Sequence, residues 1–347
     1  MTSAQQVAEA LRAPLAFAPV YKTLVWGGAR IAQLRAGVPT GPVGEAWDLA
    51  DHADGMSVVA QGPEMLRGRP LSSLMAEAGA ALVGDGYAGK TFPLMVKLID
   101  AAQNLSVQVH PDDELARKMG VGDNGKTECW RVMADGGPIY QGTRQGVDRT
   151  VFEEALATGA VADTLNRFES RAGDFFFLEA RTVHALGQNT LVYEIQQTSN
   201  VTVRVFDWGR VGLDGKPRPL HVAESLTTID FGRSDFGPRQ PAVVRDDAGG
   251  ETRVLADCAH FRVEERRGRQ LKGAANGRCV IVVLLEGQGR LCTAGGTLPM
   301  APMQTAVVPA AAGDWWFETD ARDAGEARDA AGLQIPIASA LIASPRF

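Results

Sequence analysis

Short apolar runs alternating with polar residues recur along the chain, and glycine or proline bounds most of them. The clearest runs cover residues 56–60, 105–110, 174–178, 191–195, 201–206, 279–285 and 305–308. Runs of this length with a period of two predict β-strands. So many short strands favour a β-sandwich or a barrel over a parallel α/β sheet.

Helical patterns are fewer, and they predict helices at residues 3–12, 70–79, 111–119 and 148–158. The third begins Pro-Asp-Asp-Glu; proline suits the first position of a helix, and acidic side chains favour its N-terminal dipole. We therefore expect an all-β fold that helices interrupt as insertions.

The segment 237–251 is polar and rich in proline and glycine, which predicts a domain boundary. We expect an N-terminal domain of residues 1–240, with helical insertions at about 65–90 and 111–170, and a C-terminal domain of residues 250–347. Residues 173–184 and 303–314 are weakly similar, and Asp314 then stands where His184 does. This similarity suggests two related barrels, with a metal ligand in the first alone.

Composition narrows the possible functions. The 347 residues carry a net charge of −6 without a block of basic residues, which argues against a nucleic-acid partner. The N-terminus lacks the pattern of a signal peptide, and no apolar run reaches the roughly 18 residues that span a membrane. The four cysteines form no CxxC pair. We expect reduced thiols and a cytoplasmic protein.

Four residues, Gln108, His110, Glu128 and His184, form a candidate metal site. The strand at 105–110 places Ser106, Gln108 and His110 on one face. Glu128 follows His110 by 18 residues, and His184 follows another apolar strand and a turn. Taken alone, each could be a solvated or structural residue. Two histidines, a glutamate and a glutamine oxygen together suit Zn²⁺, and a two-histidine, one-carboxylate set also suits Fe²⁺.

Charged residues further along could share this cavity. Glu194 lies ten residues beyond His184, across one expected hairpin, and Arg204 lies ten residues beyond Glu194. Alternation across adjacent strands could then bring Glu194, Arg204 and Lys126 together. A surface pair between Arg204 and Asp207 is the alternative.

Ten short motifs connect the chain to a known family. They read VWGG (25–28), GEAW (44–47), FPLMVK (92–97), LSVQVHPDD (105–113), GKTECW (125–130), GD (173–174), VHA (183–185), EIQQ (194–197), RVFDW (204–208) and KPRPLH (216–221). In their order and spacing, residues 19–229 resemble type I mannose-6-phosphate isomerases of the shorter bacterial form. The resemblance implies a cupin-type fold with two jelly-roll β-barrels. It also implies one zinc ion per chain, held by Gln108, His110, Glu128 and His184.

The resemblance also implies an activity: the interconversion of mannose 6-phosphate and fructose 6-phosphate through a cis-enediol. It makes Arg204 the catalytic arginine and Glu194 an active-site acid. Glu194 is our candidate base, which leaves both histidines for the metal. Ser106 and Lys126 match positions near the substrate phosphate, and Lys97, in a matched motif, is also expected to bind substrate.

We expect a small-molecule sugar phosphate as the partner, and a monomer or a homodimer. One departure from the family is the bulky Arg181, which stands in the turn before His184 where glycine is common. The mouth of the site is therefore expected to differ in shape. An iron-dependent cupin oxygenase and a non-catalytic sugar-phosphate sensor are the alternatives. Lys126 and Arg204 beside a metal favour a phosphorylated substrate over the oxygenase.

Overall fold

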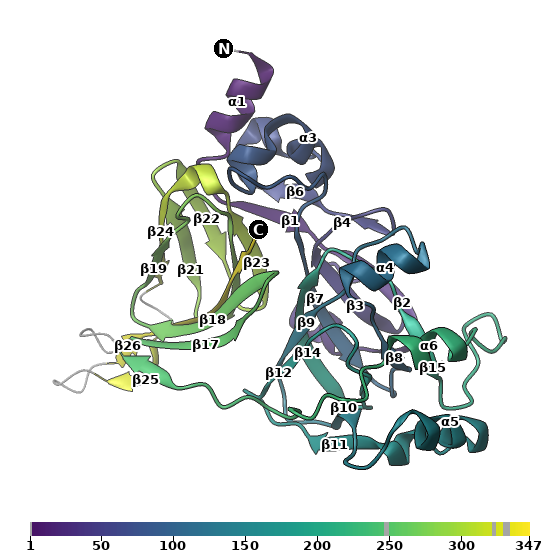
Figure 1. Ribbon diagram of the computed structural model, residues 1–347. Coiled ribbons are helices and arrows are strands. Elements are labelled where there is room, and N and C mark those ends of the chain that lie inside the picture. The colour runs from purple at the N-terminus through teal and green to yellow at the C-terminus, as the bar shows by residue number, and fades with distance from the viewer. Residues whose placement is uncertain (1, 246–249, 321–323, 329–333) are drawn as a thin grey trace. The chain divides into compact units, whose positions relative to one another are not determined.

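The computed structural model describes residues 2–245, 250–320, 324–328 and 334–347. The chain forms two compact units that are interleaved along the sequence. Unit 1 comprises Met1–Val20, Asp48–Leu94 and Pro241–Phe347, and unit 2 comprises Tyr21–Trp47 and Met95–Gln240. The predicted fold class is confirmed, because strands dominate both units and helices interrupt them (Figure 1).

Unit 2 contains two antiparallel sheets. The five-stranded sheet has the order β11 (Leu165–Glu169), β10 (Pro138–Thr143), β13 (His184–Leu186), β8 (Val107–Val109) and β15 (Val203–Phe206). The six-stranded sheet has the order β12 (Phe175–Leu178), β9 (Glu128–Val132), β14 (Thr190–Gln197), β7 (Leu94–Ala101), β2 (Val20–Gly28) and β3 (Val43–Leu49). Among the described strands, the two sheets are not joined into one closed barrel.

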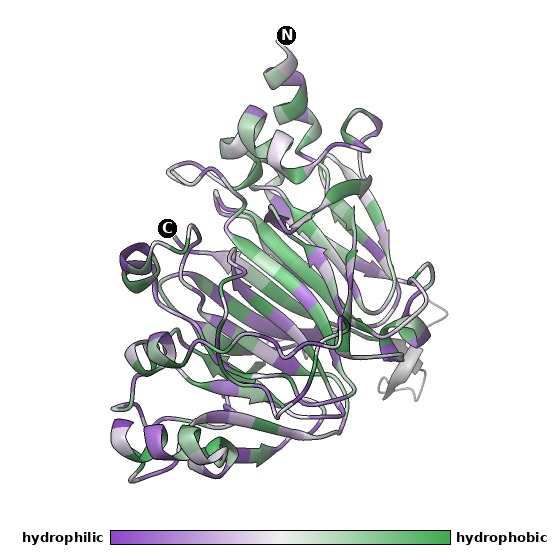
Figure 2. Cartoon of the chain, turned by 90° about the vertical axis from the view of Figure 1, so that its right-hand side faces the viewer, coloured by the Kyte–Doolittle hydropathy of each residue, from purple (hydrophilic) through white to green (hydrophobic). Residues whose placement is uncertain are grey.

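An apolar cluster fills the space between these sheets at one end. Ile139 and Leu186 enter it from the five-stranded sheet, and Trp130, Val132 and Val192 enter it from the six-stranded sheet. Many strands alternate between hydrophobic and hydrophilic colour in Figure 2. Side chains two positions apart on a strand point to the same face. On these strands, the residues two positions away from the apolar ones are polar, and they lie at the other end of the interior.

The outer face of the five-stranded sheet is covered by helices. Phe152 of α5 (Arg149–Thr158) and Leu226 of α6 (Val222–Thr228) pack there against Val107 and Val109 of β8. The odd-numbered residues of β8 therefore face this outer core, and Gln108 faces the interior.

Unit 1 is built from two further sheets. Eight strands have the order β16 (Val243–Arg245), β17 (Glu251–Asp257), β18 (Phe261–Gly268), β27 (Ala338–Pro345), β20 (Val280–Glu286), β23 (Gln304–Val308), β1 (Leu15–Ala18) and β6 (Val58–Gln61). Four strands have the order β19 (Leu271–Ala274), β24 (Asp314–Thr319), β21 (Gly289–Thr293) and β22 (Gly296–Met300). The short pairs are β4 (Asp51–His52) with β5 (Gly55–Met56), and β25 (Ala324–Arg328) with β26 (Gln334–Pro336). One apolar cluster joins both large sheets.

The interleaving differs from the sequential division of the chain that we expected. In the eight-stranded sheet, β1 pairs with β23 and β6 pairs with β1, so two strands from the N-terminal part of the chain complete unit 1. Unit 2 ends at Gln240, inside the proline- and glycine-rich segment 237–251.

Helices occur in all four predicted regions, with shifted ends. They are α1 (Ser3–Ala10), α3 (Leu71–Leu82), α4 (Asp113–Met119) and α5. The prediction that Pro111 opens α4 is wrong, because the Asp112 carboxylate caps the helix by accepting from the Leu115 N–H at 2.8 Å. The short helices α2 (Arg30–Leu34) and α6 were not predicted. No described helix is both long and apolar enough to cross a membrane.

Candidate metal centre and active site

One row of side chains crosses the inner face of the five-stranded sheet. Strand register places Arg204 of β15 opposite Gln108 of β8, Gln108 opposite His184 of β13, and His184 opposite Gln141 of β10. Residues directly opposite each other in antiparallel strands point to the same face. The register therefore places His184 and Arg204 on either side of Gln108, although they follow it in the sequence by 76 and 96 positions.

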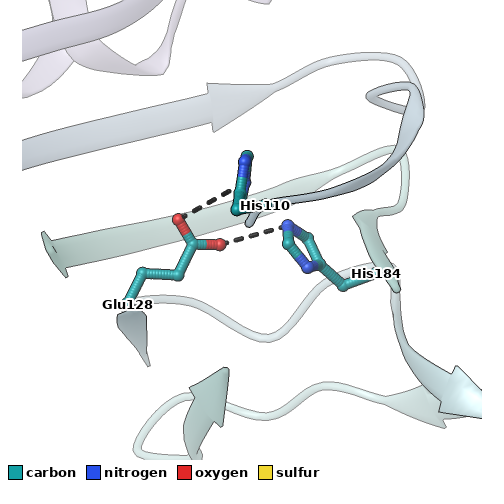
Figure 3. A group of neighbouring side chains, drawn as sticks. All are labelled: His110, Glu128 and His184. Atoms are coloured by element: carbon teal, nitrogen blue, oxygen red, sulfur yellow. Dashed lines mark ion pairs between the residues drawn. The ribbon is translucent and has the colours of Figure 1, made fainter. Parts of the chain in front are cut away.

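His110, Glu128 and His184 converge on one point in the interior of unit 2 (Figure 3). His184 Nε2 lies 3.1 Å from Glu128 Oε1, and His110 Nε2 lies 3.9 Å from Glu128 Oε2. Gln108 Nε2 lies 3.4 Å from His110 Nε2 and 3.3 Å from His184 Nε2. The four predicted ligands are thus within reach of a single ion, and the three shown in Figure 3 are each at most 1% exposed.

The backbone fixes the orientation of both imidazole rings. His110 Nδ1 lies 2.7 Å from the carbonyl oxygen of Val201, and His184 Nδ1 lies 2.8 Å from that of Thr182. A carbonyl can only accept, so both Nδ1 atoms carry the proton and both Nε2 lone pairs face the convergence point. This is the usual arrangement of metal-binding histidines, whose second nitrogen donates to a carbonyl or a carboxylate.

The side chain of Gln108 completes the set after a half-turn of its amide. Its Oε1 lies 3.5 Å from Ser106 Oγ, while its Nε2 faces the two histidine nitrogens. A 180° rotation exchanges these atoms, so that Oε1 meets the convergence point and Nε2 can donate to Ser106. The donor set is then two imidazoles, a carboxylate and an amide oxygen, which fits Zn²⁺. Lone pairs that face one another without a proton repel, and a cation removes that repulsion.

Lys126 supplies positive charge beside this site. Its Nζ lies 2.5 Å from Glu128 Oε2, and both side chains are buried. Burial works against the charged ammonium, but Glu128 and then Glu194 outweigh it and raise the pKa of Lys126. Burial also works against the carboxylate, but Lys126 and the two histidines hold the pKa of Glu128 well below its ordinary value.

His110 stays neutral in this environment. Burial is the largest cause and Lys126 the second, and together they lower the pKa of His110 well below its ordinary value, although Glu128 opposes them. A neutral imidazole keeps its Nε2 lone pair available as a metal ligand at neutral pH.

Glu194 lies beside the same site in a network of buried charges. Its Oε2 accepts a hydrogen bond from Trp130 Nε1 at 2.8 Å. Its Oε1 lies 3.2 Å from Lys97 Nζ and 3.7 Å from Lys126 Nζ. Lys97 Nζ also lies 4.9 Å from the centre of the Trp47 ring. The structure thus groups three of the residues that the sequence assigned to the site.

Arg204 is half-buried at the edge of the row. Its Nη1 donates to the carbonyl of Pro219 at 3.1 Å, and its backbone N–H donates to His221 Nδ1 at 3.0 Å. Its buried Nε has no hydrogen-bond partner in the part of the chain that the structure describes. Burial and then Arg218 lower the pKa of this guanidinium. The alternative of a surface pair with Asp207 receives no support from the contacts, because Asp207 pairs with Arg210 and Arg218.

The expected hairpin between His184 and Glu194 is wrong. His184 begins β13 in the five-stranded sheet, whereas Glu194 lies on β14 in the six-stranded sheet. Successive strands therefore cross from one sheet to the other. Glu194 approaches Lys126 from the sheet that faces Arg204, rather than from a strand next to β13.

Arg181 occupies the turn before His184 in the left-handed conformation, with φ at 72°. An L-residue pays roughly 1–2 kcal/mol for this conformation, which glycine adopts freely. Its backbone N–H donates to the His110 carbonyl at 2.7 Å, and its Nε donates to the Thr228 carbonyl at 3.1 Å. The side chain therefore adds a hydrogen bond between the turn and the end of α6 that glycine could not make.

Trp130 and His221 were not assigned a role from the sequence, although both stand in matched motifs. Alternation along β9 places Trp130 on the same face as Glu128, and this signal would have found it. His221 contacts Arg204 from 17 residues away across an irregular loop, and no local pattern indicates that contact.

The fold and the site together define a cupin-type protein with a buried candidate metal centre. Residues 15–128 match the family model described as phosphomannose isomerase type I, catalytic domain. The chain is 34% identical over 316 residues to mannose-6-phosphate isomerase ManA of Bacillus subtilis, covering 88% of this chain and 96% of that protein. The chain belongs to the type I mannose-6-phosphate isomerase family.

Solved structures agree with this membership. The crystal structure of mannose 6-phosphate isomerase from Bacillus subtilis has a TM-score of 0.82 at 27% identity, and the match covers 95% of this chain and 99% of that one. A zinc-bound mannose 6-phosphate isomerase shares the fold, with a TM-score of 0.69 at 14% identity over 96% of this chain and 100% of that one.

Proposed function

We propose that this protein is a zinc-dependent aldose–ketose isomerase that interconverts mannose 6-phosphate and fructose 6-phosphate through a cis-enediol. One ion per chain would be held by Gln108, His110, Glu128 and His184. The observation that carries the proposal is the convergence of two Nε2 lone pairs on a buried carboxylate. Family membership and the zinc in a protein of the same fold support it.

The metal, when bound, supplies a Lewis acid that polarises the oxygens on the reacting carbons. Glu194 is the proposed base that moves the proton between C1 and C2. Its Oε2 is held by Trp130, so Oε1 is the atom that takes up and returns the proton. Oε1 is buried and accepts no hydrogen bond from the described residues, although Lys97 lies close to it.

Arg204, Lys126, Lys97 and Ser106 are the proposed contacts for the substrate. Each lysine ammonium carries three donors, so pairing with a glutamate leaves donors for substrate oxygens. The unpartnered Nε of Arg204 can donate to an oxygen that gains charge during the reaction. A phosphate held by some of these cations would orient the reacting carbons.

A coupled assay that follows the conversion of mannose 6-phosphate to fructose 6-phosphate tests the proposal. Chelation followed by gel filtration should abolish turnover, and zinc should restore it. Full activity of the metal-free protein would contradict the metal role. Oxygen consumption with iron and no sugar-phosphate turnover would indicate an oxygenase, and binding without turnover would indicate a sensor.

We also propose that the enzyme works in the cytoplasm. All four cysteines are free thiols in the structure, which supports a reducing compartment.

A further inference from the structure

Trp130 contacts two elements of the proposed active site at once. Its indole N–H donates to Glu194 Oε2 at 2.8 Å. Its ring packs edge-on against the His184 imidazole, with centroids 5.3 Å apart and an angle of 83° between the planes. The side chain is 1% exposed, and strand register pairs it directly with Glu194.

We propose that Trp130 is a positioning residue, which holds the carboxylate of the base in the one rotamer from which Oε1 can transfer the proton. This inference rests on the proposed function, because it takes Glu194 as the base. Trp130 touches neither the substrate nor the reacting atoms in this role, and it acts through Glu194.

The contacts around the carboxylate show why a fixed donor is needed. Lys97 Nζ lies 3.2 Å from Oε1, and Lys126 Nζ lies 3.7 Å from the same atom. Both ammonium groups attract the same carboxylate oxygen, and ion pairs have no strong angular preference. The indole N–H is a single donor on a rigid ring that is buried between the sheets. It therefore determines which oxygen is bound and which is left for chemistry.

The edge-on contact with His184 adds a second consequence. The same ring sets the position of the base and supports the imidazole of a proposed metal ligand. Precise placement of reacting groups has a large effect on rate, since a displacement of about 1 Å can cost on the order of a hundredfold. Phenylalanine at this position would keep an aromatic ring of smaller volume and remove the N–H donor.

The test is a double-mutant cycle of Trp130→Phe and Glu194→Gln in the zinc-loaded protein, with kcat, KM and zinc content measured for each. We expect Trp130→Phe to lower kcat by about tenfold, the size of one hydrogen bond to a charged group. KM should stay within about twofold and zinc content should not change, because the substrate contacts and the ligands remain. In the Glu194→Gln background, Trp130→Phe should lower kcat no further.

A matched control removes the same kind of bond elsewhere. Trp316 Nε1 donates to Glu318 Oε1 at 3.0 Å in unit 1, so Trp316→Phe also deletes an indole bond to a glutamate. It should leave kcat unchanged. An equal loss from Trp130→Phe in both backgrounds, or wild-type kcat in Trp130→Phe alone, would overturn the positioning role.

A measurement without turnover decides the case if Trp130→Phe does not fold. Each of the six tryptophans gives one indole N–H signal in a ¹H–¹⁵N NMR spectrum. Specific labelling assigns the indole N–H signal of Trp130. The substitution Glu194→Gln should shift this signal and leave the Trp316 signal in place. No shift would refute the inference. Absence of mannose 6-phosphate turnover in the wild type, or full activity of Glu194→Gln, would instead refute the proposed function or its base.

Discussion

Replacing Lys126 with methionine tests the charge balance of the candidate metal site. The change removes a buried ammonium that lies 2.5 Å from Glu128 Oε2 and 3.7 Å from Glu194 Oε1. At an effective dielectric constant of about 20, the shorter contact alone corresponds to about 7 kcal/mol of attraction. Desolvation of both groups offsets part of this, and breaking such a buried pair typically costs about 3–5 kcal/mol.

Metal-free Lys126→Met should therefore be less stable than the metal-free wild type by about 3–5 kcal/mol. For a unit of this size, the loss corresponds to a fall in Tm of roughly 6–20 °C. Zinc should restore most of the lost stability, because its positive charge replaces that of the missing ammonium. In the variant, the bound zinc is also no longer repelled by a nearby ammonium. The rise in Tm on adding zinc should be larger in Lys126→Met than in the wild type, as measured by differential scanning calorimetry.

The matched control is Lys118→Met, which breaks an exposed pair with Glu114 on α4. Exposed pairs contribute at most about 1 kcal/mol, so its Tm should barely change with or without zinc. An equal response to zinc in Lys126→Met and in the wild type would refute the idea that Lys126 balances the charge of the site. So would a metal-free variant as stable as the wild type.

Two further substitutions test the residues beside the site. Arg204→Ala should cost about 2–4 kcal/mol of transition-state stabilisation, the range for one electrostatic donor, with zinc content unchanged. A variant within twofold of wild-type kcat/KM would remove Arg204 from the active role. Asp207→Asn should lower the free energy of unfolding by about 2 kcal/mol at pH 7, measured in urea, because Asp207 binds Arg210 and Arg218. Burial works against the carboxylate, but these arginines outweigh it and lower the pKa of Asp207, so the difference should shrink below about pH 4. A difference that does not depend on pH would contradict this reasoning.

The elements around the site were largely readable from the sequence, because local patterns determine them. Alternation along residues 105–110 placed Gln108 and His110 on one face, and the structure brings these two together with Glu128 and His184. The helices after Asp112 and Asp148 also follow from local patterns, although the first is capped by Asp112 and does not begin at Pro111 as predicted. These features depend on residues a few positions apart, which a single sequence displays.

The partners of each strand were not readable in the same way. The segment from His184 to Glu194, ten residues further on, looks like a hairpin, yet the chain crosses to the facing sheet. Likewise, β1 and β6 join the edge of the eight-stranded sheet, where their apolar residues complete it. No local pattern indicates that β1 pairs with a strand as distant in the sequence as β23. Pairing over such separations is set by the packing of the whole unit, which periodicity does not encode.

The register of β8 links the stability of unit 2 to its chemistry. Val107 and Val109 face the core beneath α5 and α6, and Gln108 between them faces the candidate metal site. A shift by one residue would bury Gln108 in the outer core and place valines in the polar interior. The apolar contacts that stabilise the sheet therefore also fix which side chains reach the metal. Donors carried on such strands are held more precisely than donors on loops, which suits a centre that must accept both an ion and a substrate.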